Sequence, residues 1–281
     1  MKNLLPILIF GAVALVSPLL AQNPAHRSGM LFEDSTYRES TPVDPTRSSE
    51  GLASFLSLKK YCPAVRDQGS MPMCVAFSIC NAMSIRLALS CEKQTGRLVK
   101  KTFSPSFVYN QIHEKPGCFI GAFLSKGLKL ANTQGVSLES VFFTDTTDCG
   151  RSITPAAQEN AQHYRITSFV SLFDPDAPGD KKLLEIKKSL SSELPVIVGM
   201  RVDKPFCELP LGGRWSPTGE KPAGHALVVI GYDDRTKTVE LLNSFGTNWG
   251  NYGFITLDYT TFVKHLRYGW EISMGRFVDC D

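Results

Sequence analysis

Three residues of the chain have the side-chain types of a nucleophilic active site: Cys74, His225 and Asn243. A thiolate attacks carbonyl carbon, a neighbouring imidazole can exchange the proton, and a side-chain amide can hold that imidazole in one orientation. In cysteine-dependent acyl transfer the histidine and the asparagine commonly lie far downstream of the thiol, as they do here. The three residues together therefore indicate acyl transfer through a thioester.

The segment around Cys74 predicts a turn that leads into a buried helix. Gly69 and Ser70 are turn or cap residues, and Pro72 suits a first helical turn. Residues 75–89 are mostly apolar, so little of the helix surface suits water. Cys74 would lie in the first turn, where unpaired backbone N–H groups and the positive end of the helix dipole favour a thiolate.

The other two residues belong to later apolar segments. His225 opens a β-branched run that predicts a buried strand, and Asn243 ends another short apolar run before a turn rich in glycine and tryptophan. Each position also has a purely structural interpretation: a buried inert thiol for Cys74, a satisfied core histidine for His225 and a turn-forming asparagine for Asn243. Their joint occurrence in this order favours the catalytic interpretation.

The chain resembles the papain and cathepsin family of cysteine peptidases from about residue 57 to residue 259. The motifs that carry the resemblance are Gln68-Gly69-Ser70 with Cys74 six positions after the glutamine, Gly224-His225-Ala226, Asn243-Ser244-Phe245-Gly246-Thr247-Asn248-Trp249-Gly250, and Tyr252-Gly253-Phe254. Two further segments are similar to bacterial secreted members: Arg66-Asp67-Gln68 and Gly231-Tyr232-Asp233-Asp234. The resemblance implies an α+β fold with two lobes. A helical lobe would carry the nucleophile helix, and an antiparallel, barrel-like β lobe would carry the histidine and the asparagine.

The resemblance also implies a role for each site residue. Cys74 would be the nucleophile, His225 its ion-pair partner and proton carrier, and Asn243 the residue that orients the imidazole. Gln68 would complete an oxyanion hole with the backbone N–H of Cys74, although a polar turn residue is the alternative. Trp249 would line the substrate cleft on the leaving-group side, or serve packing alone.

Three positions depart from the family pattern. Met71 replaces a cysteine three residues before the nucleophile, which removes a structural disulfide rather than chemistry. Val75 replaces a tryptophan directly after the nucleophile and changes the packing there. Phe245 replaces the tryptophan of the asparagine motif, and we expect it to shield the hydrogen bond between His225 and Asn243 less completely from water.

Residues 1–21 predict a secretory signal peptide, with Lys2 as the positive start and a short apolar core over residues 4–16. A membrane anchor is disfavoured because the core is too short and is interrupted by Pro6 and Pro18. We therefore expect a secreted or periplasmic protein. Residues 22–56 are polar and rich in Ser, Thr and Pro, which predicts a flexible N-terminal arm or a short pro-segment before a peptidase domain over residues 57–281.

Composition excludes several classes of function. Removing 21 of the 281 residues leaves 260, enough for one large domain or two lobes around a cleft, and the loss of Lys2 lowers the net charge from +3 to +2. No basic run indicates nucleic acid, and no later stretch indicates a membrane. No CxxC or HxxxH spacing indicates a metal, and no cofactor is expected. The expected partner is a peptide or protein substrate, and the oligomeric state is open.

All eight cysteines follow the signal peptide, so disulfides are permitted. If Cys74 stays free as a nucleophile, an odd number remains, and at least one further cysteine must be unpaired. Cys80, on the apolar helix, is the best candidate for an inert buried thiol. The family resemblance implies a bridge between Cys118 and Cys149, and other connectivities stay open.

The leading interpretation is a secreted thiol peptidase. The alternative is a binding or scaffold protein on the same fold in which Val75 and Phe245 mark a loss of catalysis. A third interpretation keeps the enzyme but replaces water with an amine acceptor, as in transglutaminase-like transfer, and product mass distinguishes it. The sequence leaves open the substrate and the choice between endopeptidase and exopeptidase action.

Overall fold

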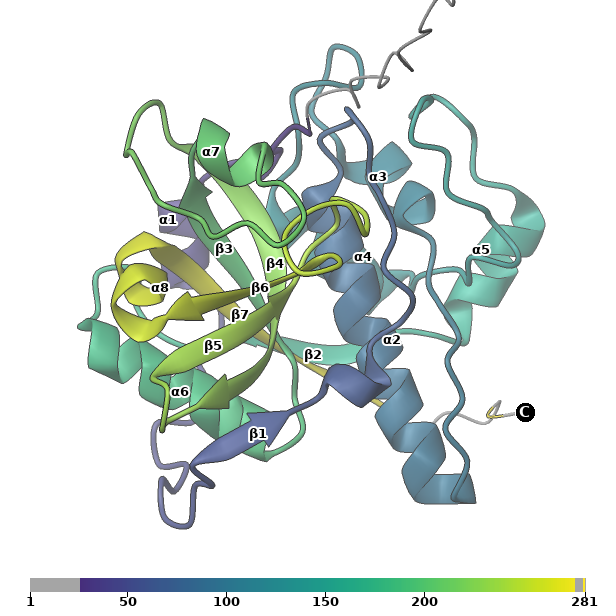
Figure 1. Ribbon diagram of the computed structural model, residues 1–281. Coiled ribbons are helices and arrows are strands. Elements are labelled where there is room, and N and C mark those ends of the chain that lie inside the picture. Colours follow the sequence, from purple (N-terminus) through teal and green to yellow (C-terminus); the bar gives the residue numbers. More distant parts are fainter. Residues whose placement is uncertain (1–25, 276–279, 281) are drawn as a thin grey trace, which may run out of the picture.

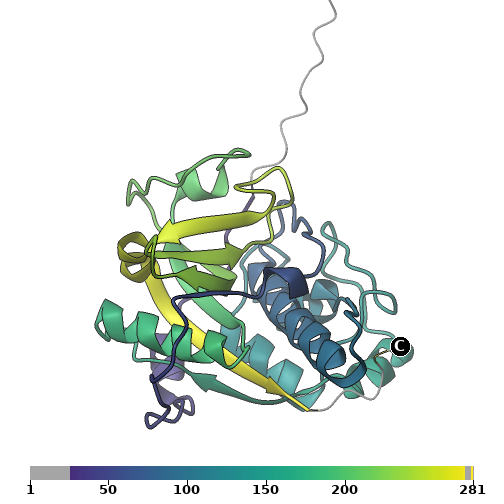
Figure 2. The same ribbon diagram turned by 60° about the horizontal axis from the view of Figure 1, so that its bottom comes forward.

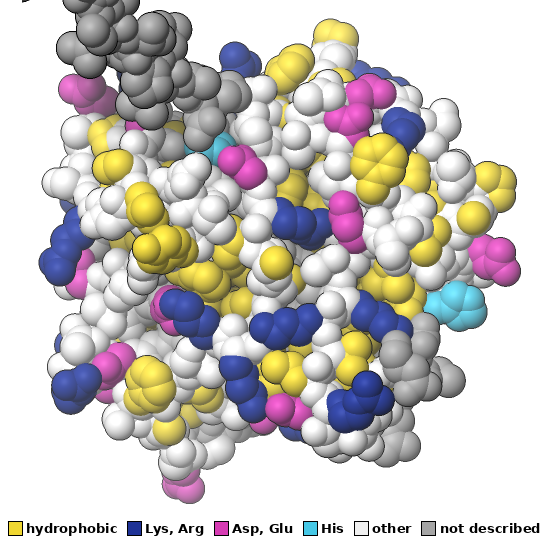
Figure 3. Space-filling model, turned by 45° about the vertical axis from the view of Figure 1, so that its right-hand side comes forward, with side chains coloured by type: hydrophobic (Ala, Val, Ile, Leu, Met, Phe, Trp, Pro, Cys, Tyr) yellow, Lys and Arg dark blue, Asp and Glu magenta, His cyan; other side chains and the backbone are white. Residues whose placement is uncertain are grey.

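The computed structural model describes residues 26–275 and residue 280 (Figure 1). The expected signal peptide, residues 1–21, lies outside the described residues. Two lobes stand side by side, one built from helices and one from a twisted sheet (Figure 1). On the face toward the helical lobe, basic, acidic and apolar side chains are interspersed (Figure 3).

The helical lobe is organised around a long buried helix. Its helices are α2 (Cys74–Thr95), α3 (Pro105–Ile112), α4 (Leu124–Thr133) and α5 (Pro155–Gln162). Helix α2 ends at Gly96, whose φ of 70° is a left-handed cap that glycine adopts without strain. By length and composition α2 could cross a membrane, but it is largely buried inside the protein and forms its core. The continuous apolar run after Cys74 therefore predicted this helix correctly.

The β lobe is one antiparallel sheet with the strand order β2-β7-β3-β4-β5-β6, and β1 pairs with β4 beside this path. Its strands are β1 (Phe55–Ser57), β2 (Ile166–Ser171), β3 (Val196–Val202), β4 (Ala223–Asp233), β5 (Thr238–Leu242), β6 (Phe254–Asp258) and β7 (Leu266–Met274). Helices α6 (Gly179–Ser191) and α8 (Tyr259–His265) contact this sheet (Figure 2). Two further short helices are the 3₁₀ helix η1 (Lys59–Tyr61) and α7 (Lys204–Cys207).

The strand register brings the candidate residues to one place. His225 lies near the start of β4, opposite Met200 of β3, and Asn243 directly follows β5. Because β4 and β5 are antiparallel neighbours, the start of one strand lies beside the end of the other. Helix α2 packs against β4, so its first residue, Cys74, faces the same region.

The N-terminal arm differs from the flexible segment expected from its composition. Residues 26–56 lie along the protein and include helix α1 (Asp34–Glu39) and strand β1. The reason is long-range pairing: α1 buries the ring of Tyr37, and β1 joins the sheet beside β4.

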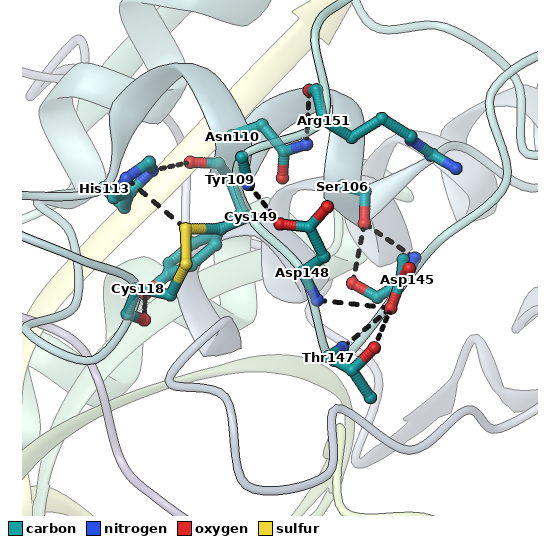
Figure 4. The surroundings of a disulfide bond; sticks show 11 residues. Ser106, Tyr109, Asn110, His113, Cys118, Asp145, Thr147, Asp148, Cys149 and Arg151 are labelled. Atoms are coloured by element: carbon teal, nitrogen blue, oxygen red, sulfur yellow. Dashed lines mark hydrogen bonds between the residues drawn. A yellow bond between two sulfur atoms is a disulfide. The ribbon is translucent and has the colours of Figure 1, made fainter.

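Two disulfides are present among the described residues. The bond between Cys118 and Cys149 confirms the pairing that the family resemblance implied (Figure 4). Cys91, near the end of α2, bonds to Cys280 at the C-terminal end, a connectivity that the sequence left open. The free cysteines in the described part of the chain are Cys62, Cys74, Cys80 and Cys207. Burial raises the pKa of the Cys80 thiol, as expected for an inert cysteine.

Candidate active site

Cys74 is the first residue of α2 and is fully buried. The backbone N–H of Gly29 donates a hydrogen bond to its Sγ over 3.3 Å. Burial raises the pKa of the thiol, against the opposite effect of backbone hydrogen bonds from Ala226 and Gly29. Ala226 directly follows His225, so the thiol lies beside the histidine's strand. The direction of this shift is opposite to the one expected at a helix N-terminus, because burial of the thiol outweighs the backbone hydrogen bonds that it accepts.

His225 and Asn243 form a hydrogen bond of 2.7 Å between Nε2 and Oδ1. An amide oxygen only accepts, so Nε2 of the neutral imidazole carries the proton and donates it. Among the described residues, Nδ1 of His225 has no hydrogen-bond partner, which leaves its lone pair available for proton transfer. Burial lowers the pKa of His225 to about 4, and the hydrogen bond to Asn243 acts in the opposite direction.

Aromatic side chains enclose this pair. Phe245 packs on the imidazole of His225 with 4.6 Å between ring centroids, and Phe206 approaches the same imidazole edge-on at 5.6 Å. The imidazole of His26 stacks on the ring of Phe245, with 4.4 Å between ring centroids and an interplanar angle of 14°. The hydrogen bond is thus fully buried, although we expected Phe245 to shield it incompletely. Neighbouring rings supply the cover that the smaller side chain lacks.

Gln68 is buried and its side chain is fully hydrogen-bonded. Its Nε2 donates to the carbonyl oxygens of Arg27 and Met71, both at 2.8 Å, and its Oε1 accepts from Oγ of Ser244 at 2.7 Å. The backbone N–H of Gln68 also donates to the carbonyl oxygen of Ser244. The amide of Gln68 therefore has one fixed orientation, in which it donates to a carbonyl oxygen of the covering segment.

Trp249 lies beneath these residues rather than on the surface. Its side chain is buried, its Nε1 donates to the carbonyl oxygen of Phe206 over 2.7 Å, and its ring meets Phe245 edge-on. Its contacts are thus those of a packing residue that supports the rings around the imidazole.

Residues 26–32, which we call the strap, cover Cys74 and contact both lobes. The N–H of Met30 donates to the carbonyl oxygen of Gly224 in the β lobe. The N–H of Leu31 donates to the carbonyl oxygen of Ala122 in the helical lobe, whose own N–H donates to Gly29. The purple N-terminal chain in Figure 1 accordingly crosses from the side of the helical lobe to α1 beside the sheet.

The disulfide between Cys118 and Cys149 lies in the part of the helical lobe that contacts the strap. Ala122 follows Cys118 by four residues, and the carbonyl oxygen of Cys118 accepts a hydrogen bond from the hydroxyl of Tyr109. His113 lies against the disulfide, with Nε2 3.5 Å from Sγ of Cys149 (Figure 4). The loop that presents Ala122 to the strap is therefore tied at its start to the helices of the lobe.

The structure brings Cys74, His225, Asn243 and Gln68 to one location, and the sequence did not predict the strap. The arm was judged by its polar composition, which hides the short apolar segment from Gly29 to Phe32. That segment was the available signal, because four such residues in a polar arm indicate a contact with the protein.

Comparisons with known proteins agree with this geometry. A family model described as papain family cysteine protease matches residues 56–267. The chain is 27% identical over 212 residues to the uncharacterized peptidase C1-like protein L477 of Acanthamoeba polyphaga mimivirus, a match that covers 69% of this chain and 63% of that protein. It is 27% identical over 206 residues to cathepsin K of Gallus gallus, covering 71% and 56%. The chain thus spans less than two thirds of the length of these two relatives.

Solved structures show the same fold. Xylellain, a cysteine protease from Xylella fastidiosa, has a TM-score of 0.72 and 20% identity, covering 92% of this chain and 100% of that chain. Digestive procathepsin L 3 from the larval midgut of Tenebrio molitor has a TM-score of 0.64 and 17% identity, covering 84% and 74%. The expected two-lobe α+β fold is therefore confirmed. Since the family model also matches most of the sequence, the chain belongs to the papain family of cysteine proteases.

Proposed function

We propose that this protein is a thiol peptidase that hydrolyses peptide bonds through a thioester on Cys74. The observation that carries the proposal is the 2.7 Å hydrogen bond from Nε2 of His225 to Asn243, which leaves Nδ1 as the free base beside the thiol's helix. A scaffold would need neither a fixed tautomer nor an unpartnered buried nitrogen, since leaving such a nitrogen unpaired costs stability.

The mechanism follows from these groups. Nδ1 of His225 takes the proton of Cys74, and the thiolate attacks the carbonyl carbon of the scissile amide. The oxyanion accepts hydrogen bonds from Gln68 and from the backbone N–H of Cys74, and one such donor is typically worth about 3 kcal/mol of barrier. The imidazolium then protonates the leaving amine. In the second half, His225 removes a proton from water, which attacks the thioester and releases the acid and the free thiol.

The strap supports a second element of the proposal, that residues 26–32 inhibit the enzyme until they leave the cleft. The carbonyl oxygen of Arg27 takes the hydrogen bond from Gln68 that an oxyanion would need. The N–H of Gly29 donates to Sγ of Cys74, so the strap also occupies the place beside the thiol. A strap held in this way blocks access of a substrate to Cys74.

We also propose that the protein is secreted. Two disulfides are typical of proteins outside the reducing cytosol, and residues 1–21 have the pattern of a signal peptide.

The test is selective labelling of Cys74. Purified protein without residues 1–21 is treated with a thiol-directed epoxide inhibitor of papain-like enzymes, before and after limited proteolysis of the strap, and mapped by mass spectrometry. We expect labelling of Cys74 only after the strap is removed, together with cleavage of a peptide library into products carrying the mass of water. A folded protein that stays unlabelled after strap removal would instead favour the scaffold interpretation, and amine-containing products would favour transfer.

A further inference from the structure

Residues 33–47, which we call the anchor, are held to the β lobe far more firmly than the strap that precedes them. The ring of Tyr37 is 1% exposed and packs edge-on against Trp270 with 4.9 Å between centroids. Its hydroxyl donates to the carbonyl oxygen of Gly269 over 2.9 Å and accepts from the N–H of the same residue over 3.1 Å. Removing the anchor would therefore expose a core aromatic site on β7.

An ion-pair network also ties the anchor to the protein. Arg47 binds Glu185 through Nη2 at 2.9 Å and Glu271 through Nη1 at 2.7 Å. Both carboxylates are nearly buried; Lys188 lies 2.9 Å from Glu185, and Arg86 interacts electrostatically with Glu271. Without Arg47, each of the two carboxylates would lose an ion-pair partner, which is destabilising for nearly buried charges.

The start of the anchor holds one particular side chain, Tyr268 of β7. The hydroxyl of Tyr268 donates to Oδ1 of Asp34 over 2.6 Å and accepts from the N–H of Glu33 over 2.6 Å. Asp34 is itself fixed by Arg267, whose hydrogen bonds hold the pKa of that carboxyl at about 2. Glu33 and Asp34 of the anchor therefore fix the position of the Tyr268 side chain through its hydroxyl.

Tyr268 borders the place where the strap inserts its one deeply buried side chain. Met30 is 3% exposed and lies between two glycines of neighbouring strands. A Cβ added at Gly199 would lie 2.6 Å from Sδ of Met30 and 2.7 Å from Cδ2 of Tyr268, and one added at Gly224 would lie 3.1 Å from Cε of Met30. These glycines and Tyr268 form a recess that we call the Met30 pocket.

The strap lacks the anchor's contacts. It is held by backbone hydrogen bonds, by the buried side chain of Met30 and by the hydrogen bond from Gln68 to the carbonyl oxygen of Arg27. Its other side-chain contacts are those of His26 with Phe245 and the half-exposed Asp67, of Arg27 with Phe119, and of Phe32 with Arg201 and Tyr268. Unlike the anchor, the strap has no nearly buried ion pair among the described residues. An event that opens the cleft can therefore remove residues 26–32 and leave residues 33–57 in place.

We propose that residues 33–57 remain on the active enzyme, and that Asp34, held there, is a positioning residue that fixes Tyr268 as a wall of the Met30 pocket. The proposal rests on the peptidase function proposed above and extends it to substrate selection. A substrate that replaces the strap meets the same backbone groups of Ala122 and Gly224, so one of its side chains enters the pocket. With two glycines and an aromatic ring as lining, the pocket takes an unbranched apolar side chain such as that of methionine.

The retention of residues 33–57 is tested by an experiment that does not measure enzymatic activity. A recognition sequence for a site-specific protease is placed in the exposed loop over residues 48–53, a second one is placed in the strap, and the folded protein is cut at both and gel-filtered. We expect the fragment that contains residues 33–47 to co-elute with the protein in about equal molar amount, as measured by mass spectrometry. A fragment that separates under native conditions, from a protein that remains folded, would overturn the proposal.

The positioning role is tested by comparing Asp34→Ala with Asp176→Ala in the strap-cleaved protein. Both carboxylates bind Arg267, but only Asp34 binds Tyr268. We expect Asp34→Ala to raise KM for a methionine-containing peptide roughly tenfold, the size of one lost hydrogen bond, with kcat changed less than twofold. Tyr268→Phe, which removes only the hydroxyl, should act in the same way, Asp34→Asn should restore much of the affinity, and Asp176→Ala should change little.

Equal effects of Asp34→Ala and Asp176→Ala, or unchanged KM in both Asp34→Ala and Tyr268→Phe, would overturn the positioning role. If the unaltered protein neither labels at Cys74 nor turns over peptide, the proposed function fails, while the retention experiment still reports on the anchor.

Discussion

The backbone N–H of Gly29 donates to Sγ of Cys74, so a segment of the chain's own arm lies on its candidate nucleophile. The contact joins residues 45 positions apart in sequence. Burial under this segment raises the pKa of the Cys74 thiol and lowers the pKa of His225, because both charged forms lose their contact with water.

A substitution at Gly29 should open the cleft. A Cβ at this position would lie 2.2 Å from the carbonyl oxygen of Pro72, a backbone atom that cannot yield cheaply. We expect Gly29→Ala to raise the rate of Cys74 alkylation by about tenfold or more, since a clash of this kind costs 1–3 kcal/mol or more. The matched control is Gly275→Ala, whose Cβ would meet its nearest neighbour at an ordinary 3.7 Å. Equal alkylation rates in the two variants would contradict the claim that the strap shields Cys74.

Removal of the thiol should abolish turnover without unfolding the protein. In the strap-cleaved enzyme we expect Cys74→Ala to lower kcat at least about a thousandfold, because residual catalysis by the oxyanion hole lacks a nucleophile. Thermal melting of the variant checks that the fold is intact. Cys62→Ala serves as control, since Cys62 is also a buried free cysteine but bonds only weakly to the carbonyl oxygen of Leu58. Peptide hydrolysis that survives in Cys74→Ala would refute the mechanism.

Gln68 should act on kcat rather than on KM. Loss of its amide removes one donor to the oxyanion, so Gln68→Ala should lower kcat by about a hundredfold or more and leave KM within a few-fold. Ser244→Ala should give a smaller loss of the same kind, because Ser244 orients Gln68 through Oε1. Steady-state kinetics on one peptide measure both. An effect confined to KM would identify Gln68 as a binding residue instead.

Acidification should release the strap. Burial lowers the pKa of His225 to about 4 in the covered form, and exposure to water would return it toward its ordinary value near 6.5. The covered form therefore binds fewer protons, so its stability relative to the open form falls as the pH drops from about 6.5 to about 4.

Hydrogen exchange at the amides of residues 29–31, corrected for intrinsic pH dependence, measures this opening. We expect an increase of at most about two orders of magnitude across that range. A corrected exchange rate that falls toward pH 4 would contradict the assignment.

Local patterns were enough to select the candidate residues. Cys74, His225 and Asn243 each begin or end an apolar run, and the ends of such runs are where a buried element reaches a cleft. The runs that became β4 and β5 were recognised for the same reason, since each is a short apolar stretch beside polar or turn residues.

What escaped prediction depends on partners distant in sequence. Strand β7 carries Arg267 and Glu271 within an otherwise apolar run, and the anchor supplies an ion-pair partner to each of them, Asp34 and Arg47. The pairing partners lie more than 200 residues apart, and composition alone does not connect them. The same holds for the bond between Cys91 and Cys280, with a separation of 189 residues.

The short distance along the chain between strap and anchor has a consequence for how inhibition responds to dilution. Because the anchor is fixed to the β lobe, the strap is a tethered ligand, and a short tether of this kind gives an effective concentration in the millimolar range. Occupancy of the cleft is then independent of protein concentration. Once the chain between residues 26–32 and residue 33 is cut, the released peptide is diluted into its surroundings and the millimolar effective concentration is lost.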